Sequence, residues 1–470
     1  MSVRRKLIVD TLLYGAGDVL TKAIAFVLIP LYTNALIPAE YGVYQLLVLF
    51  VTVTMVFAMS GMNVALFKHF VVAREEKQRR DLFTSTLIWV VVGSLIIIAL
   101  AYIFSGPLAE LLTGSENRGK LVGLAAVNAG LETVILVSLL IFRMEKKPVG
   151  YVSYNLVKVI LILGGNFLLV WKLDMGVEGI ILAGIIADLV ILAPILLRVG
   201  RYLSFPLRPR LIYSMLLWGI PFIPASIATV VLTLSDRLLL RFMSGFEAAG
   251  IYSVGYKIAG AIFLLYTAFR FAWGPYMFEL ARSNESANES YPRVLLPVIS
   301  ALGFAAVGLV ALSPEIFKFF VGDSYHAARA VLIPVSMAPV FEAMSLFFGA
   351  GLQTRDRTIY APAVTGLAAI VNILLNVLLI PRFGFMGAAW ATLISYGVMA
   401  YISHSMGNRF MPVSYPWGII SAIVITASAG IAGAWFLEPL TARIGVILAS
   451  GALLGIFGFR RGMPGNENLR

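Results

Sequence analysis

Glu40-Tyr41-Gly42-Val43-Tyr44 returns 208 positions later as Ala248-Ala249-Gly250-Ile251-Tyr252. The same shift pairs a second group of identical residues: Gly176, Gly179, Ala183 and Ile186 with Gly384, Gly387, Ala391 and Ile394. Two separated matches at one offset indicate that the chain contains a duplicated half. Each half carries several long apolar runs, which predicts a duplicated bundle of membrane helices.

The composition supports a membrane protein. Hydrophobic residues make up 60% of the chain, charged residues only 13%, and the mean hydropathy is +0.91. Water-soluble domains are nearer to half apolar, and a soluble chain of this kind would expose large apolar patches. The apolar runs have roughly the 20-residue length that a helix needs to cross the bilayer, whereas a barrel would show shorter, alternating segments. The sequence therefore predicts an all-α polytopic membrane protein.

About fourteen transmembrane helices are expected from these runs. Their cores are expected at 11–33, 43–66, 82–104, 121–142, 149–171, 179–197, 212–241, 250–272, 294–313, 328–350, 359–380, 387–406, 417–436 and 440–459. Prolines inside or near the ends of these spans predict bends, because proline frees a backbone carbonyl group. These prolines are Pro30, Pro221, Pro224, Pro334, Pro339 and Pro362.

Basic residues gather on alternate loops, as they do on loops that face the cytoplasm. With the N-terminus inside, the inner segments of the first half hold Arg4, Arg5 and Lys6; Lys68, Arg74, Lys77, Arg79 and Arg80; Arg143, Lys146 and Lys147; and Arg198, Arg201, Arg208 and Arg210. The outer loops hold far fewer. We therefore expect both termini to be cytoplasmic.

Six helices per half fit the repeat. They give an N-terminal lobe at 1–208, a C-terminal lobe at 209–416, and an extra helix pair with a cytoplasmic tail at 417–470. An even number of helices per lobe keeps both lobes in the same orientation, so the repeat is parallel. A duplicated bundle of this kind is the usual build of a transporter, with a substrate path between the halves.

Ionisable residues at membrane depth are costly, which makes each a functional candidate. Asp18 and Lys22 share one face of the first helix, where they form an internal ion pair, line a polar cavity, or do both. Glu132 and Glu342 fall within two residues of each other under the repeat. Because desolvation favours the protonated form of a carboxyl group, each suits ion coupling, although a structural hydrogen-bonded acid is an equal alternative.

The remaining intramembrane charges fall into two groups. Lys158 and Asp188 are expected to be partners across adjacent helices. The seventh and eighth spans carry an excess of basic residues over the single acid Asp236, which favours an anion-binding lumen, and the arginine fork suits phosphate. We assign five cations to this lumen: Arg237, Lys257, Arg270, Lys22 and Lys158. We assign five acids to ion coupling: Glu132, Glu342, Asp18, Asp188 and Asp236.

Several other classes of function are disfavoured. The chain has no cysteine, and its histidines, His69, His326 and His404, lack metal-ligand spacing, so neither a metal nor a cofactor is expected. The net charge of +12 is explained by cytoplasmic loops rather than by nucleic-acid binding. No Gly-x-x-x-x-Gly-Lys-Ser/Thr loop appears, which argues against ATP hydrolysis. Acids of the outer loops show no catalytic pairing, so we do not expect an enzyme, and a membrane polysaccharide polymerase or ligase is a remote alternative.

Three stretches resemble a known family. Pro30-Leu31-Tyr32-Thr33 followed by Ala39-Glu40-Tyr41-Gly42-Val43-Tyr44 looks like the start of bacterial polysaccharide-biosynthesis membrane proteins. Ser235-Asp236-Arg237 with Ala249-Gly250-Ile251-Tyr252-Ser253-Val254 looks like their mid-chain signature, and Gly384-Phe385-Met386-Gly387-Ala388-Ala389 resembles the turn before their twelfth helix. The similarity spans essentially the whole chain. These proteins are the oligosaccharide-lipid flippases, for O-antigen and exopolysaccharide, of the multidrug/oligosaccharidyl-lipid/polysaccharide exporter superfamily.

The resemblance implies two six-helix lobes in a V-shaped, alternating-access arrangement in the bacterial inner membrane. It implies an undecaprenyl-pyrophosphate-linked oligosaccharide as substrate, carried from the inner to the outer leaflet for polysaccharide biosynthesis. A cationic lumen would then screen the pyrophosphate. H⁺ or Na⁺ is the implied coupling ion, and polysaccharide polymerase or assembly proteins are implied partners. A cation-coupled multidrug exporter and a peptidoglycan-precursor flippase of the same superfamily are the alternatives.

Overall fold

The computed structural model describes residues 24, 26–145, 147–282, 287–354 and 360–460. These residues form helices joined by short turns, and no strand occurs among them. Twelve of their helical stretches are long and apolar enough to cross a membrane. The prediction of an all-α polytopic membrane protein is therefore confirmed, while the count of fourteen is approximate.

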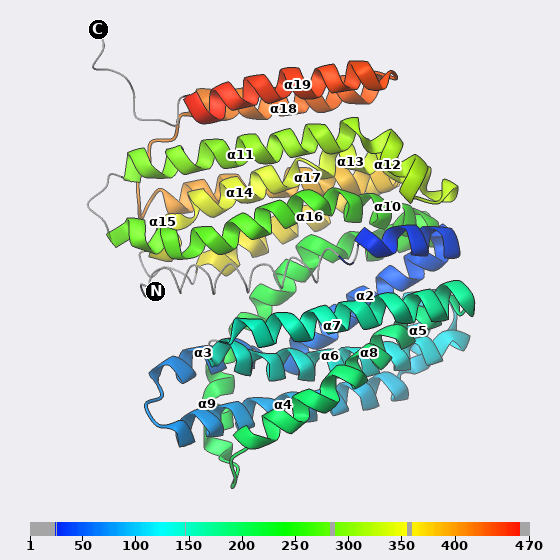
Figure 1. Cartoon of the computed structure of the whole chain (residues 1–470), viewed down its shortest axis with the longest axis vertical. Coiled ribbons are helices and arrows are strands. Elements are labelled where there is room, and N and C mark those ends of the chain that lie inside the picture. The colour runs from blue at the N-terminus through cyan, green and yellow to red at the C-terminus, as the bar shows by residue number, and fades with distance from the viewer. Residues whose placement is uncertain (1–23, 25, 146, 283–286, 355–359, 461–470) are drawn as a thin grey trace. The chain divides into compact units, whose positions relative to one another are not determined.

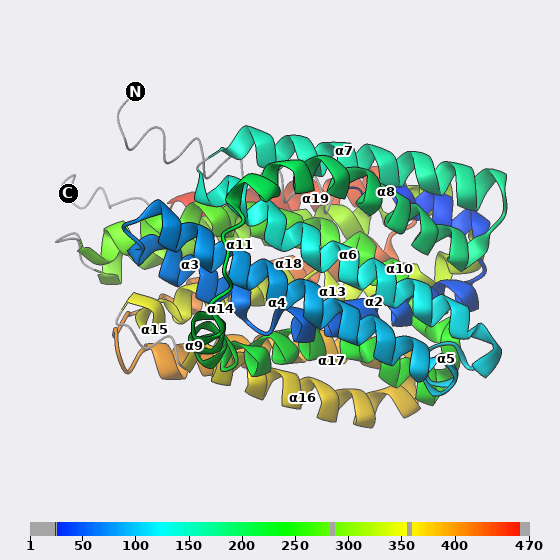
Figure 2. The same ribbon diagram turned by 90° about the horizontal axis from the view of Figure 1, so that it is seen from below.

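The chain divides into two compact units, Met1–Leu238 and Leu239–Arg470. The lobes expected at 1–208 and 209–416, with the pair at 417–470, describe the duplicated segments and stay a prediction. In the first unit α6 packs against α4, α8 and α2, and α7 packs on α8 (Figures 1 and 2). The helices of this unit are α2 (Pro38–Met59), α3 (Met62–Val72), α4 (Glu76–Ile103), α5 (Ser105–Thr113), α6 (Gly119–Met144), α7 (Pro148–Asn166), α8 (Gly176–Val199) and α9 (Pro209–Gly219).

In the second unit α17 packs against α16 and α14, while α18 and α19 pack on each other and on α11 (Figure 1). Its helices are α11 (Ala287–Ala311), α12 (Ser313–Phe320), α13 (Leu332–Val335), α14 (Ala338–Phe348), α15 (Ala350–Thr354), α16 (Tyr360–Phe383), α17 (Phe385–Gly407), α18 (Trp417–Phe436) and α19 (Leu440–Gly455). The boundary between the two units falls inside α10 (Phe222–Arg282).

The span predicted at 43–66 is two helices rather than one. α2 ends at Met59 and α3 begins at Met62, because Ser60 and Gly61 adopt left-handed backbone conformations with φ of 47° and 72°. A Cβ atom on Gly61 would collide with the carbonyl group of Gly219 at the end of α9. The break therefore lets the backbones of the two helix ends approach more closely than any side chain would permit.

Prolines divide two further predicted spans. Pro221 follows α9, so the expected helix over 212–241 is split before α10 begins. Pro334 and Pro339 lie in the predicted span 328–350, which is built from a 3₁₀ segment (Asp323–Val331), α13 and α14. α10 in turn joins parts of two predicted spans, with Gly245 as its non-helical residue (φ 87°, ψ 172°). These breaks explain why the helix count from hydropathy is approximate.

The internal repeat appears in the backbone as well as in the sequence. Gly176 is the first residue of α8 and Gly384 immediately precedes α17, and both have the same left-handed φ of 56°. Three residues further on, a Cβ atom on Gly179 would lie 3.1 Å from the carbonyl oxygen of Leu169, and one on Gly387 would collide with that of Leu379. The duplicated glycines thus build the same tight turn in both units.

A buried arginine links the C-terminal helix pair to α11 and α12 of the second unit. Arg443 of α19 is 4% exposed and binds Glu315 of α12 through both ends of its guanidinium group, at 2.6 Å and 2.9 Å. It also donates a hydrogen bond of 2.6 Å to the Ala311 carbonyl oxygen at the end of α11. Hydrogen bonds from Arg443 hold the pKa of the Glu315 carboxyl group below its ordinary value.

We predict that this pair makes stability depend on pH. A lowered pKa in the folded state means that the contribution of Glu315 is present above its unfolded-state pKa and is lost as the pH falls through the folded-state value. Glu315→Gln should therefore lower the unfolding temperature in detergent at neutral pH and have a smaller effect in acid. Glu438→Gln, at an exposed position before α19, is the control. Equal effects of the two substitutions at neutral pH would contradict the prediction.

Candidate functional site

Three of the predicted site residues meet in the first unit. Lys158 of α7 places its Nζ atom 2.8 Å from Asp188 Oδ1 of α8 and 3.5 Å from Glu132 Oε1 of α6. Asn128, one turn before Glu132 on α6, donates a hydrogen bond of 3.3 Å to the other carboxylate oxygen of Asp188. The expected partnership of Lys158 with Asp188 is confirmed, and Glu132 joins them. We call these four residues the Lys158 cluster.

Helix packing explains why the cluster forms. Asn128 and Glu132 lie four residues apart, so both occupy the face of α6 that meets α8. A Cβ atom on Gly184 would lie 3.0 Å from the Asn128 amide nitrogen. Gly184 thus leaves room for Asn128 one turn before Asp188, and the amide reaches the carboxylate.

The burial and charge of the cluster limit its chemistry. The side chain of Asp188 is 1% exposed, that of Lys158 is 13% exposed and that of Glu132 is 36% exposed. Two carboxylates share one ammonium group, so the fully ionised cluster carries one negative charge. Net charge within hydrocarbon is costly. The arrangement therefore favours the uptake of one further positive charge, and Glu132 is the acid with the most access to water.

Aromatic and amide groups surround the same region. Rings of Tyr32, Tyr41 and Tyr44 lie with centroids 5.7–6.2 Å apart. The Tyr32 hydroxyl donates a hydrogen bond of 2.9 Å to Asn166 of α7. Tyr44 is close enough to Glu132 for an electrostatic interaction. The sequence analysis did not assign these tyrosines to the site, although Tyr41 and Tyr44 lie inside the duplicated Glu40–Tyr44 stretch, which was the available signal.

The second unit holds a different set of polar residues around Glu342 of α14. Tyr266, which is 4% exposed, interacts with Arg270 one turn further along α10 and lies within electrostatic range of Glu342. Tyr396 of α17 interacts with Tyr256 and is also within range of Glu342. This region thus offers hydroxyl groups around one acid.

The internal repeat relates the two regions, but different residues occupy their equivalent positions. A shift of 208 positions places Asp188 on Tyr396 and Lys158 on Gly366. A carboxyl group at nearly the same level is common to both units, but the lysine and its partner aspartate occur at these positions only in the first.

The other assigned cations differ in their surroundings. Arg237 is 3% exposed and its Nη1 atom lies 2.6 Å from Asp236 Oδ1, so this cation has a counter-charge. Lys257 is half-buried, and Arg270 is exposed. These last two residues are 13 positions apart on α10, which separates their Cα atoms by about 20 Å along a regular helix. A cavity shared by all three stays a prediction, and Asp18 and Lys22 lie outside the described residues.

No group of three or more potential metal ligands occurs within the described segments.

Comparison of the sequence with known proteins identifies a matching family. Residues 7–281 match the family described as polysaccharide biosynthesis protein. Two similar proteins come from Haloferax volcanii. The probable low-salt glycan biosynthesis flippase Agl15 is 24% identical, with 58% of each chain covered, and the probable flippase AglR is 30% identical, with 34% of each covered. The matches therefore span about half or less of the length of these relatives.

Solved structures show the same fold at low identity. The lipid II flippase MurJ in an inward closed conformation has a TM-score of 0.72 and 14% identity, with 96% of this chain and 99% of that chain covered. An inward-facing multidrug resistance transporter of the MATE family has a TM-score of 0.64 and 12% identity, covering 88% and 96%. The fold is thus shared by proteins with different cargo.

We predict that the Lys158–Asp188 pair is strongly coupled. Lys158→Met and Asp188→Asn should each lower stability, by up to about 3–5 kcal/mol, because each leaves a buried charge without its nearest counter-charge. The double variant should recover much of the loss, which a double-mutant cycle of unfolding in detergent measures. The control is the exposed pair Lys120–Glu178, whose coupling should be about 0–1 kcal/mol. A coupling for Lys158–Asp188 no larger than this control would contradict the prediction.

Proposed function

Because this chain belongs to the family of polysaccharide biosynthesis proteins, we propose that it is a flippase for a lipid-linked oligosaccharide. The proposed substrate is an undecaprenyl-pyrophosphate-linked oligosaccharide, moved from the inner to the outer leaflet of the cytoplasmic membrane by alternating access. The family match over residues 7–281 carries the proposal. The names of both Haloferax relatives support it, and so does a fold shared with a lipid flippase.

The charge distribution within the spans supports an anionic head group. Arg270 is exposed, and none of the ion pairs among the described residues includes it. Lys257 lies at a different level of the same helix. A pyrophosphate in transit would meet these cations in succession, and arginine can donate two hydrogen bonds at once to phosphate. Lys158 and Arg237 already have carboxylate partners, so we propose that they contribute less to binding.

The direction of movement follows from the proposed orientation. Both termini and the basic segment 67–81 would face the cytoplasm, and the proposed substrate would enter from the inner leaflet. Polysaccharide polymerase or assembly proteins would receive the product on the other side.

The first experiment measures binding and flipping of the glycolipid by purified protein in proteoliposomes. We expect Arg270→Gln to weaken binding about tenfold or more, because a hydrogen bond to a charged group is worth about 1.5–3 kcal/mol. Arg270→Lys should restore part of the loss. Arg382→Gln, at an exposed position near the end of α16, is the matched control.

Two results would contradict this proposal. One is wild-type affinity in the Arg270→Gln variant. The other is transport of hydrophobic cations with no movement of glycolipid, which would favour the multidrug exporter. Cleavage or polymerisation of the glycan by the purified protein would favour the enzyme alternative.

We further propose that Glu132 couples transport to a proton. The Lys158 cluster has one carboxylate more than it has ammonium groups, and Glu132 is its most accessible acid. Protonation of Glu132 would leave the buried Lys158–Asp188 pair neutral, so uptake and release of one proton would switch the local charge between zero and minus one.

Glu132→Gln should therefore abolish most of the stimulation of flipping by a pH gradient, while flipping without a gradient persists. Glu342→Gln tests the corresponding acid of the second unit in the same assay. Normal stimulation in both single variants and in the double variant would place coupling elsewhere, and stimulation by a sodium gradient alone would contradict proton coupling.

A further inference from the structure

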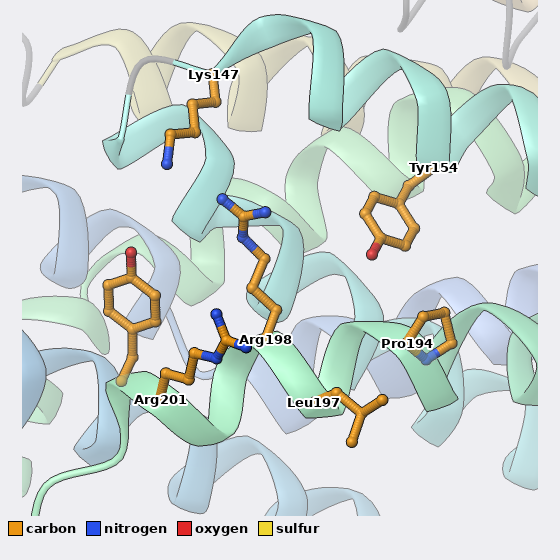
Figure 3. A pocket seen from close by; sticks show the side chains of 7 residues that line it. Lys147, Tyr154, Pro194, Leu197, Arg198 and Arg201 are labelled. Atoms are coloured by element: carbon orange, nitrogen blue, oxygen red, sulfur yellow. The ribbon is translucent and has the colours of Figure 1, made fainter.

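A basic pocket lies in the first unit where α7 begins and α8 ends. The cavity has a volume of about 400 Å³. Figure 3 shows the side chains of Lys147 and Arg198 turned toward the same space, with Arg201 below them and Tyr154 opposite. Pro194 and Leu197 of α8 and the residue Tyr202 complete the lining.

The pocket lies at the ends of two candidate membrane spans, Pro148–Lys172 and Gly176–Tyr202. In the apolar 18-residue window of the span that includes α7, 6% of the residues are buried, the smallest share among the candidate spans. The helix beside the pocket therefore has few buried residues, and its apolar side chains are available to a ligand.

The pocket carries an excess of positive charge. Lys147 and Arg198 both bind the same oxygen of Glu145, at 2.9 Å and 3.0 Å. The guanidinium group of Arg198 also lies over the Phe142 ring, 4.6 Å from its centre, which fixes its orientation. Arg201 is exposed and takes part in none of the ion pairs found among the described residues. Three cations and one carboxylate leave two positive charges in excess.

Part of the pocket lining on α8 is apolar. Leu197 is 79% exposed, and Pro194 is also exposed. Leu189 and Val190 continue this apolar surface along α8, with exposed fractions of 52% and 50%. A ligand in the pocket would therefore meet cations at one end and a hydrocarbon-like surface at the other.

We propose that this pocket binds the phosphate group of an anionic membrane phospholipid. Basic pockets at the ends of membrane helices suit lipid head groups, and juxtamembrane cations are attracted to anionic lipid. The apolar wall favours a lipid over free phosphate, because the acyl chains would lie along Pro194 and Leu197. The site is separate from the Lys158 cluster and does not depend on the proposed transport function.

The test uses full-length protein, stripped of lipid in detergent, and three probes: phosphatidylglycerol, phosphatidylcholine and inorganic phosphate. The readouts are the number of lipids retained in native mass spectrometry and the shift in unfolding temperature with probe concentration. We expect phosphatidylglycerol to bind and stabilise at concentrations where the other two do not. Arg201→Gln should weaken this binding about tenfold, and Arg201→Lys should weaken it less.

Arg210→Gln is the matched control, because it removes another exposed arginine from the same chain segment outside the pocket. Lys147→Gln should also weaken binding, which tests a second wall of the site. Equal phosphatidylglycerol affinity in the Arg201→Gln and Arg210→Gln variants would overturn the proposal. Equal stabilisation by inorganic phosphate or phosphatidylcholine would overturn the assignment to an anionic lipid.

Discussion

A charge within hydrocarbon must have its counter-charge within a few ångströms, and this requirement determines how the polar residues of the first unit are arranged. Lys158 lies between two carboxylates from two other helices. Arg237 is buried more deeply than Lys158 and takes its counter-charge from the neighbouring Asp236. Neither cation would be stable in hydrocarbon alone. The contacts of Lys158 join three helices and therefore fix the rotation of α6, α7 and α8 about their axes, since another rotation would separate the charges.

The backbone obeys a related constraint. Hydrogen-bonding groups freed at a helix break have no water to bind within the membrane. The breaks at Ser60-Gly61 and after Gly219 lie against each other, so the backbones of Gly61 and the buried Gly219 shield one another. Gly61 allows this contact because a side chain there would collide with the partner backbone.

The asymmetry between the repeats gives the two units different chemistry. The first unit has a compact cluster in which one proton would change the net charge. The second has tyrosines and an exposed arginine around one acid. Such a division would let one half respond to an ion while the other contacts an anionic head group.

The proposed lipid pocket involves the same two helices as the Lys158 cluster. It lies where α7 begins and α8 ends, and these helices supply Lys158 and Asp188. A lipid bound there would therefore contact helices that carry the cluster.

The membrane class, the helical architecture and the internal repeat could all be predicted from the sequence. Hydropathy over a window and identity at a fixed offset are properties of the chain that need no knowledge of packing. The sequence also anticipated the Lys158–Asp188 pair, because both residues need a partner in adjacent spans. The contact of Glu132 with this pair depends on how α6 packs against its neighbours and could not be predicted from the sequence.

The helix break at Gly61 and the basic pocket were also not predictable from the sequence. The sequence marked Pro221, but hydropathy runs on through Gly61, where the backbone turns. The sequence placed Lys147 and Arg198 on inner loops, whereas their common partner Glu145 and the cavity beside them emerged from the packing of α6, α7 and α8. The physical reason is that hydropathy gives the length of a helix but not its rotation, and rotation decides which side chains meet.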